Sequence, residues 1–167
     1  MPNNLSKKER LLLEDQKSHE EMCIEKYTNY ANQAQDPQLK QLFKTYAAEE
    51  QEHLNTVNQI LAGQVPDMNQ QNQQSGGQAA QQNTQAGTAQ TMQAQGEAGL
   101  DNQNDANLCT DMLMTEKYVS DTYDTAIFEC RDTNIRQALN HIQKEEQEHG
   151  EGIFNYMQAN GMYNVEQ

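Results

Sequence analysis

Apolar residues recur at steps of three, four and seven along four stretches of the chain, the spacing of one buried helix face. The first stretch opens with Ser-Lys-Lys-Glu at residues 6–9, which has the form of a capping box, and predicts a helix to about Ala34. Asp36 and Pro37 follow as an N-cap and a first-turn proline. They predict a second helix that ends at Gly63.

The second half of the chain shows the same two-helix pattern. A third helix is predicted from about Asp105 to Cys130, and Asp132 is the expected N-cap of a fourth helix that ends near Gly161. The turns after Ala34 and after Cys130 are short enough that each pair of helices must form an antiparallel hairpin. The pattern therefore predicts an all-α fold, a four-helix bundle of two hairpins.

The two hairpins are copies of one unit. The pentapeptide EEQEH occurs at residues 49–53 and again at 145–149. Laying residues 12–63 over residues 108–159 without a gap gives 11 identities in 52 positions. A repeat in one fixed register indicates a structural requirement shared by both halves.

The segment between the two copies differs in composition from both. Residues 64–103 hold 13 Gln and 4 Asn, with no aromatic residue, Lys or Arg. So little apolar surface does not offset the entropy of ordering, which predicts a flexible, disordered linker that crosses the length of the bundle. The predicted organisation is a first hairpin at residues 1–63, this linker at 64–103, and a second hairpin at 104–167 that joins the first in one bundle.

A glutamate interrupts the apolar stripe of every predicted helix, and in two helices a histidine follows three residues later on the same face. Burying four carboxylates together costs several kcal/mol for each unless they are paired, protonated or bound to metal. One Glu from each of two helices and Glu-x-x-His from each of the others is the ligand pattern of di-iron and di-manganese carboxylate bundles. The predicted metal ligands are Glu20, Glu50, His53, Glu116, Glu146 and His149.

The neighbours of these residues leave alternatives open. Tyr27 and Tyr123 lie two turns from Glu20 and Glu116 on the same faces, either as core aromatics or as donors to the ligand carboxylates. The other glutamates of the two pentapeptides are predicted to be solvated, and His19 and His141 fall off the stripes. The alternative to a metal site is a cluster of protonated, hydrogen-bonded carboxyls. Carboxylate-rich sites bind iron or manganese alike, so the metal stays open between those two.

The motifs Glu-x6-Tyr and Glu-x-x-His, each present twice, resemble those of the ferritin-like superfamily, especially rubrerythrin-type and manganese-catalase-type bundles. The stretches LCTDMLMTEKYVSDTYDTAIFEC and EEQEHGEGIFNYMQANGMYNV resemble the spore coat protein F family of endospore-forming bacteria. That second resemblance covers about residues 106–165. It implies a location in the spore coat, with other coat proteins or further copies of the chain as partners.

Composition narrows the range of functions. A net charge of −14 disfavours nucleic acid as a partner, because phosphates would be repelled. No apolar run is long enough to span a membrane, and the N-terminal residues lack the apolar stretch of a signal peptide, which predicts synthesis in the cytoplasm. Cys23, Cys109 and Cys130 are an odd number without metal-ligand spacing, which favours buried thiols over disulfides.

The residues and the two resemblances together leave three classes of function, of which the spore coat role is what the resemblance to the coat protein F family implies. The first is a structural spore coat protein that keeps a carboxylate-bridged dimetal site. The second is a dimetal oxidoreductase that acts on peroxide or dioxygen, similar to manganese catalase or rubrerythrin. The third, iron storage, is disfavoured because two short hairpins joined by a long linker do not resemble a cage-forming subunit.

Overall fold

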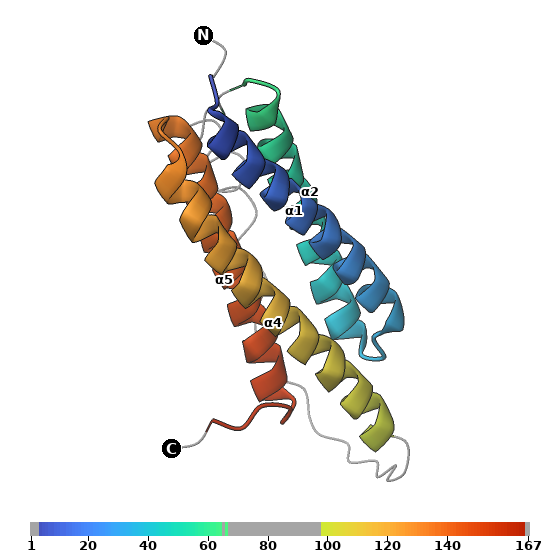
Figure 1. The fold of residues 1–167 in the computed structure, drawn as a ribbon. Coiled ribbons are helices and arrows are strands. Elements are labelled where there is room, and N and C mark those ends of the chain that lie inside the picture. The colour runs from blue at the N-terminus through green and yellow to red at the C-terminus, as the bar shows by residue number, and fades with distance from the viewer. Residues whose placement is uncertain (1–3, 65, 67–97, 166–167) are drawn as a thin grey trace, which may run out of the picture.

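The computed structural model describes residues 4–64, 66 and 98–165, and within these ranges all regular structure is helical. The helices are α1 (Lys7–Gln33), α2 (Pro37–Leu61), α4 (Ala98–Glu129) and α5 (Thr133–Ala159). Helices α1 and α2 form one antiparallel hairpin, and α4 and α5 form the other beside it (Figure 1). This arrangement confirms the predicted all-α four-helix bundle.

The helices begin where the sequence predicts because polar side chains bind their first free N–H groups. The Ser6 hydroxyl accepts from the Glu9 N–H at 3.2 Å, and the Glu9 carboxylate accepts from the Ser6 N–H at 2.6 Å. Asp36 and Asp132 each accept a hydrogen bond from the backbone N–H two residues later, at 2.8 Å in both cases. The capping box and both N-caps are thereby confirmed.

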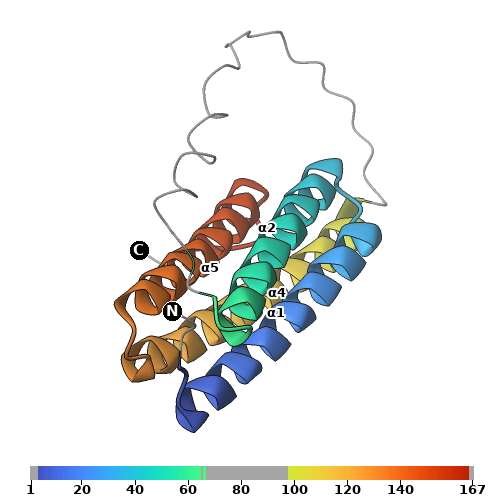
Figure 2. The same cartoon turned by 90° about the horizontal axis from the view of Figure 1, so that it is seen from above.

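The order of the helices around the bundle requires a long crossing connection. Helix α1 packs on α2 and α4, and α5 packs on α4 and α2 (Figure 2). The end of α2 and the start of α4 lie at opposite ends of the bundle (Figure 1). The chain between them must therefore run the length of the bundle, as predicted.

Helix α4 begins earlier than the sequence indicates. Its first residue is Ala98, seven residues before the predicted start at Asp105, so it takes in the last residues of the predicted linker. Lengthening an existing helix adds one hydrogen bond for each residue fixed, which explains why polar residues join it without an apolar stripe of their own. Most of the predicted linker lies outside the described residues, and its flexibility stays a prediction.

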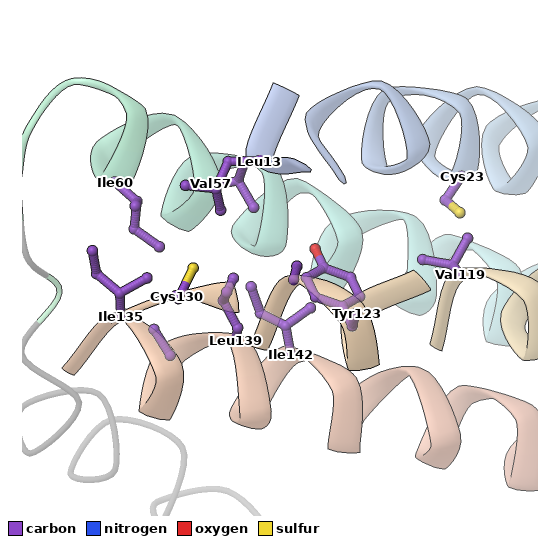
Figure 3. Close-up of a cluster of buried hydrophobic side chains, with 12 residues drawn as sticks. Leu13, Cys23, Val57, Ile60, Val119, Tyr123, Cys130, Ile135, Leu139 and Ile142 are labelled. Atoms are coloured by element: carbon purple, nitrogen blue, oxygen red, sulfur yellow. The ribbon is translucent and has the colours of Figure 1, made fainter. Parts of the chain in front are cut away.

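Two apolar clusters fill the bundle on either side of a polar centre. The first lies toward the end where α4 turns into α5 and contains Ile60 of α2 and Ile135 of α5 (Figure 3). The second lies toward the α1–α2 turn and contains Leu39 and Phe43 of α2. In the register of the repeat, Leu39 of the second cluster corresponds to Ile135 of the first cluster. The two clusters are therefore equivalent parts of the two repeated hairpins. The bundle thus has a pseudo-twofold axis through the polar centre. All three cysteines are buried and free, which confirms the prediction of buried thiols.

Each hairpin also holds the turn of the other hairpin through one buried acid. The Asp105 carboxylate accepts hydrogen bonds from the N–H groups of Gln35 and Asp36 at 2.8 and 2.9 Å. At the equivalent position Glu9 accepts from the Arg131 N–H at 2.8 Å and pairs with its guanidinium at 3.0 Å. Asp105 is therefore a contact between hairpins rather than the start of a helix.

We expect Asp105→Ala to lower the free energy of unfolding by about 1–3 kcal/mol, because two partly buried N–H groups of the α1–α2 turn lose their acceptor. Asp15→Ala, at an exposed position of α1, should change it by no more than about 0.5 kcal/mol. Urea unfolding followed by circular dichroism measures both. Equal effects of the two substitutions would contradict a role for Asp105 in holding the turn.

Candidate metal centre

The six predicted ligands converge in one layer at the middle of the bundle, and we call them the Glu/His layer. All six are buried, and together they come from all four helices. They form two overlapping groups whose ligand atoms lie within 4.8 Å of one another in each group. Glu50 and Glu146 belong to both groups; Glu20 and His53 complete one, and Glu116 and His149 complete the other.

Both histidines turn the same ring nitrogen toward the layer. The Nδ1 of His53 lies 3.3 Å from Glu50, 3.1 Å from Glu146 and 3.6 Å from Glu20. The Nδ1 of His149 lies 3.1 Å from Glu50 and 3.6 Å from Glu116. Each imidazole therefore faces carboxylates of both hairpins, and Nδ1 is the nitrogen available to a metal.

The opposite nitrogen of each ring meets a carboxylate that the sequence analysis placed in solvent. The Nε2 of His53 lies 2.9 Å from Glu145, and the Nε2 of His149 lies 2.7 Å from Glu49. Glu49 is exposed, as predicted, whereas Glu145 is half-buried. The sequence analysis did not anticipate that either carboxylate contacts a buried histidine. Such a carboxylate fixes the tautomer of a metal-binding histidine, because the Nε2–H donates to it and leaves Nδ1 free.

The two tyrosines join the hairpins across the layer. The hydroxyl of Tyr27 donates to Glu116, and the hydroxyl of Tyr123 donates to Glu20. Both rings are fully buried. The two hydroxyls thus orient Glu20 and Glu116, the two glutamates that are not shared between the ligand groups.

The surroundings of the two histidines differ. The ring of Tyr46 lies against His149, with the ring centroids 4.3 Å apart. A side chain at Gly152 would clash with the Tyr46 hydroxyl, so this packing requires glycine there. In the repeat, the position of Tyr46 is taken by Ile142, and no aromatic residue is available to cover His53 from there.

Burial sets the proton affinity of the carboxyls. It raises the pKa of Glu20 to about 8 and that of Glu146 well above its usual range. Burial acts on Glu50 in the same direction, but hydrogen bonds from His149 and His53 outweigh it and hold the pKa of Glu50 low. Buried carboxyls of one layer therefore differ in charge when no metal is bound.

The same environment raises the proton affinity of the two imidazoles. Burial acts to lower the pKa of His149, but its contacts with carboxylates, Glu116 first among them, raise that pKa to about 12. The pKa of His53 is also raised well above its usual range, against burial, by Glu145 and its other carboxylate neighbours. Protons thus supply the positive charge that the carboxylates of a metal-free layer require.

Hydrogen bonding does not satisfy the layer fully. One carboxylate oxygen of Glu20, of Glu116 and of Glu146 is buried without a hydrogen-bond partner in the described part of the chain. Unpartnered buried acceptors cost about 1–3 kcal/mol each. A divalent cation bound by carboxylate oxygens and imidazole nitrogens would remove this cost, so the donor set fits iron or manganese.

A family model described as the Coat F domain matches part of this chain. The matched residues are 104–166. The second hairpin, with α5 and nearly all of α4, is therefore similar to the Coat F domain. No curated protein and no solved structure matches the chain. Within the described residues, none of the helices combines the length and the apolar character needed to cross a membrane.

We expect the metal-free protein to lose stability as pH rises from 5 to 8, by on the order of 2–4 kcal/mol. Glu20, Glu146 and both histidines bind protons more tightly when folded. Their contribution is complete below the unfolded pKa values, about 4.3 for Glu and 6.5 for His. It is lost as pH rises toward about 8 for Glu20 and 12 for His149. The lowered pKa of Glu50 has the opposite effect on stability, but this effect acts only at acidic pH, below the unfolded pKa of Glu.

Urea unfolding of chelator-treated protein at pH 5, 6.5 and 8 measures this dependence. Glu20→Gln should reduce the slope, because an amide does not ionise in this pH range. Stability that is constant or that increases over the range would contradict the protonation scheme.

Proposed function

We propose that this protein is a spore coat component with a ferritin-like bundle that binds two divalent metal ions, iron or manganese. The observation that carries the metal site is the pair of overlapping ligand groups, which share Glu50 and Glu146. Shared carboxylates are what a two-metal centre requires, because metals about 3.5–4 Å apart are bridged by common ligands.

Each side chain has a defined part in such a centre. Glu50 and Glu146 would hold both ions, Glu20 and Glu116 would each hold one of them, and His53 and His149 would be ligands through Nδ1. Four carboxylates and two neutral imidazoles balance two divalent cations in charge. Tyr27, Tyr123, Glu49 and Glu145 orient the ligands by the hydrogen bonds described above.

The metals would connect all four helices at mid-bundle. Because the ligands come from both hairpins, bound metal holds the hairpins together where the apolar clusters are interrupted. A metal that binds only the folded state stabilises it by mass action. We propose that this makes the bundle a rigid unit of the coat, with other coat proteins or further copies of the chain as its partners.

Similarity of the second hairpin to the Coat F domain supports the location in the coat. The first hairpin repeats the second in register and packs with it in one bundle, so the whole chain fits the same role. Fractionation of purified endospores, with detection by an antibody against the protein, tests the location. Recovery from the spore core and not from the coat extract would contradict it.

Elemental analysis of the purified protein tests the metal centre. We expect about two iron or manganese ions per chain, and a loss of most of this metal in Glu50→Ala and in Glu146→Ala, because each removes a ligand of both ions. His149→Ala should lower the affinity by at least about tenfold, as removal of a partner of a metal site does.

His19→Ala is the matched control for the histidine substitution. His19 is half-buried on α1 and lies near Gln16 and Thr122, outside both ligand groups, so metal content should not change. His141 is a poorer control because it lies 3.4 Å from Glu145, which contacts His53. Metal content that is unchanged when all four layer glutamates are replaced would exclude the centre.

A further inference from the structure

A cavity of about 870 Å³ between α4 and α5 opens beside the Glu/His layer. Its lining includes two of the layer glutamates, Glu116 and Glu146. Exposed side chains, among them Asp121 and Asp124, stand at its mouth. The cavity therefore reaches from solvent to the outer side of the layer, at the second hairpin.

The two layer glutamates in the lining of this cavity have unused capacity for a cation. Glu116 is 1% exposed and Glu146 is 0% exposed, and each has an oxygen without a hydrogen-bond partner among the described residues. Cations are the ligands that such oxygens take.

Gly150 has no structural reason to be glycine. It lies inside α5, where glycine costs about 1 kcal/mol relative to alanine, and its φ is not positive. A Cβ there would meet the Leu113 side chain at 3.8 Å and that of Glu116 at 3.9 Å, both ordinary contacts. Gly152, in contrast, is required by the Tyr46 hydroxyl. The effect of glycine at position 150 is the space that it leaves in the cavity.

The internal repeat shows what would fill that space. In the register of the repeat, Gly150 replaces Leu54, and Ser120, also in the cavity lining, replaces Ile24. Both residues of the first hairpin are half-buried. Gln143 is larger than its counterpart Ala47, but its amide donates to the Ser120 carbonyl at 2.8 Å and is held along the wall. At positions 120 and 150 the second hairpin therefore carries smaller side chains beside the layer than the first hairpin does.

We propose that this cavity is the route by which divalent cations reach and leave the Glu/His layer, and that Gly150 and Ser120 keep it open. The proposal rests on the metal centre proposed above. Asp121 and Asp124 attract cations to the mouth, and their charge outweighs that of Lys117 beside them. Glu116 and Glu146 then receive the cation where the cavity meets the layer.

Loading and release of Mn²⁺ by the full-length protein test this route. Loading is followed by the loss of the electron paramagnetic resonance signal of free Mn²⁺, and release by the decline of protein-bound manganese after addition of excess EDTA. Gly150→Leu should slow both rates by about tenfold. The Kd should stay unchanged, because a narrowed route raises the barrier equally in both directions and leaves the ligands in place.

Gly150→Ala is the matched control. It gives the helix the same gain in propensity and adds only a Cβ with ordinary contacts, so its rates should equal those of the wild type. Ser120→Ile narrows the cavity from α4 and should slow both rates as well. It gives an independent answer if circular dichroism shows that Gly150→Leu does not fold.

Wild-type rates in Gly150→Leu or, should that variant not fold, in Ser120→Ile would overturn the route while leaving the metal centre intact. Slowing by Gly150→Ala as large as that by Gly150→Leu would also overturn it, because helix stiffness would then be the cause. A wild-type protein that binds no Mn²⁺, Fe²⁺ or other divalent cation would remove the metal centre and the route together, which is a different result from unchanged rates.

Discussion

Burial of four carboxylates and two imidazoles in one layer is the constraint on which the rest of this bundle depends. Like charges so close together are tolerated only with compensating positive charge, whether protons or metal ions supply it. The structure divides its apolar core into two clusters around this layer and supplies hydrogen-bond donors from its tyrosines and histidines. A bundle built for stability alone would place apolar residues there.

The layer is also the contact between the two hairpins. Tyr27 of α1 donates to Glu116 of α4, and each histidine Nδ1 faces a glutamate of the other hairpin. At the ends of the bundle the same exchange occurs, because Asp105 and Glu9 each bind the turn of the opposite hairpin. Neither hairpin completes a ligand group alone, so formation of the site and association of the hairpins are one event.

The sequence predicts the parts of this structure that a single helix determines. The period of apolar residues and the N-caps at Asp36 and Asp132 depend on neighbours in the chain, and both are confirmed. The sequence analysis missed the contacts of Glu49 and Glu145 because their partners are histidines of the other hairpin. A helical period shows which residues of one helix face the bundle centre, but it does not show how the neighbouring hairpin is positioned against that helix. Asp105 was taken for a helix start for the same reason, since its partners lie in another hairpin.

Comparison of the two copies of the repeat shows which residues of and around the layer are identical in both hairpins and which differ. Of the 11 identical pairs, five are residues of the layer or bind them, namely the pairs of Glu20, Tyr27, Glu49, Glu50 and His53. One step outward the halves differ: Tyr46 against Ile142, and Leu54 against Gly150. Changes next to the ligands alter packing and access at little cost, whereas a change among them leaves a buried charge unpaired. The layer therefore stays symmetric while its surroundings diverge, and this divergence accompanies the cavity beside the layer in the second hairpin.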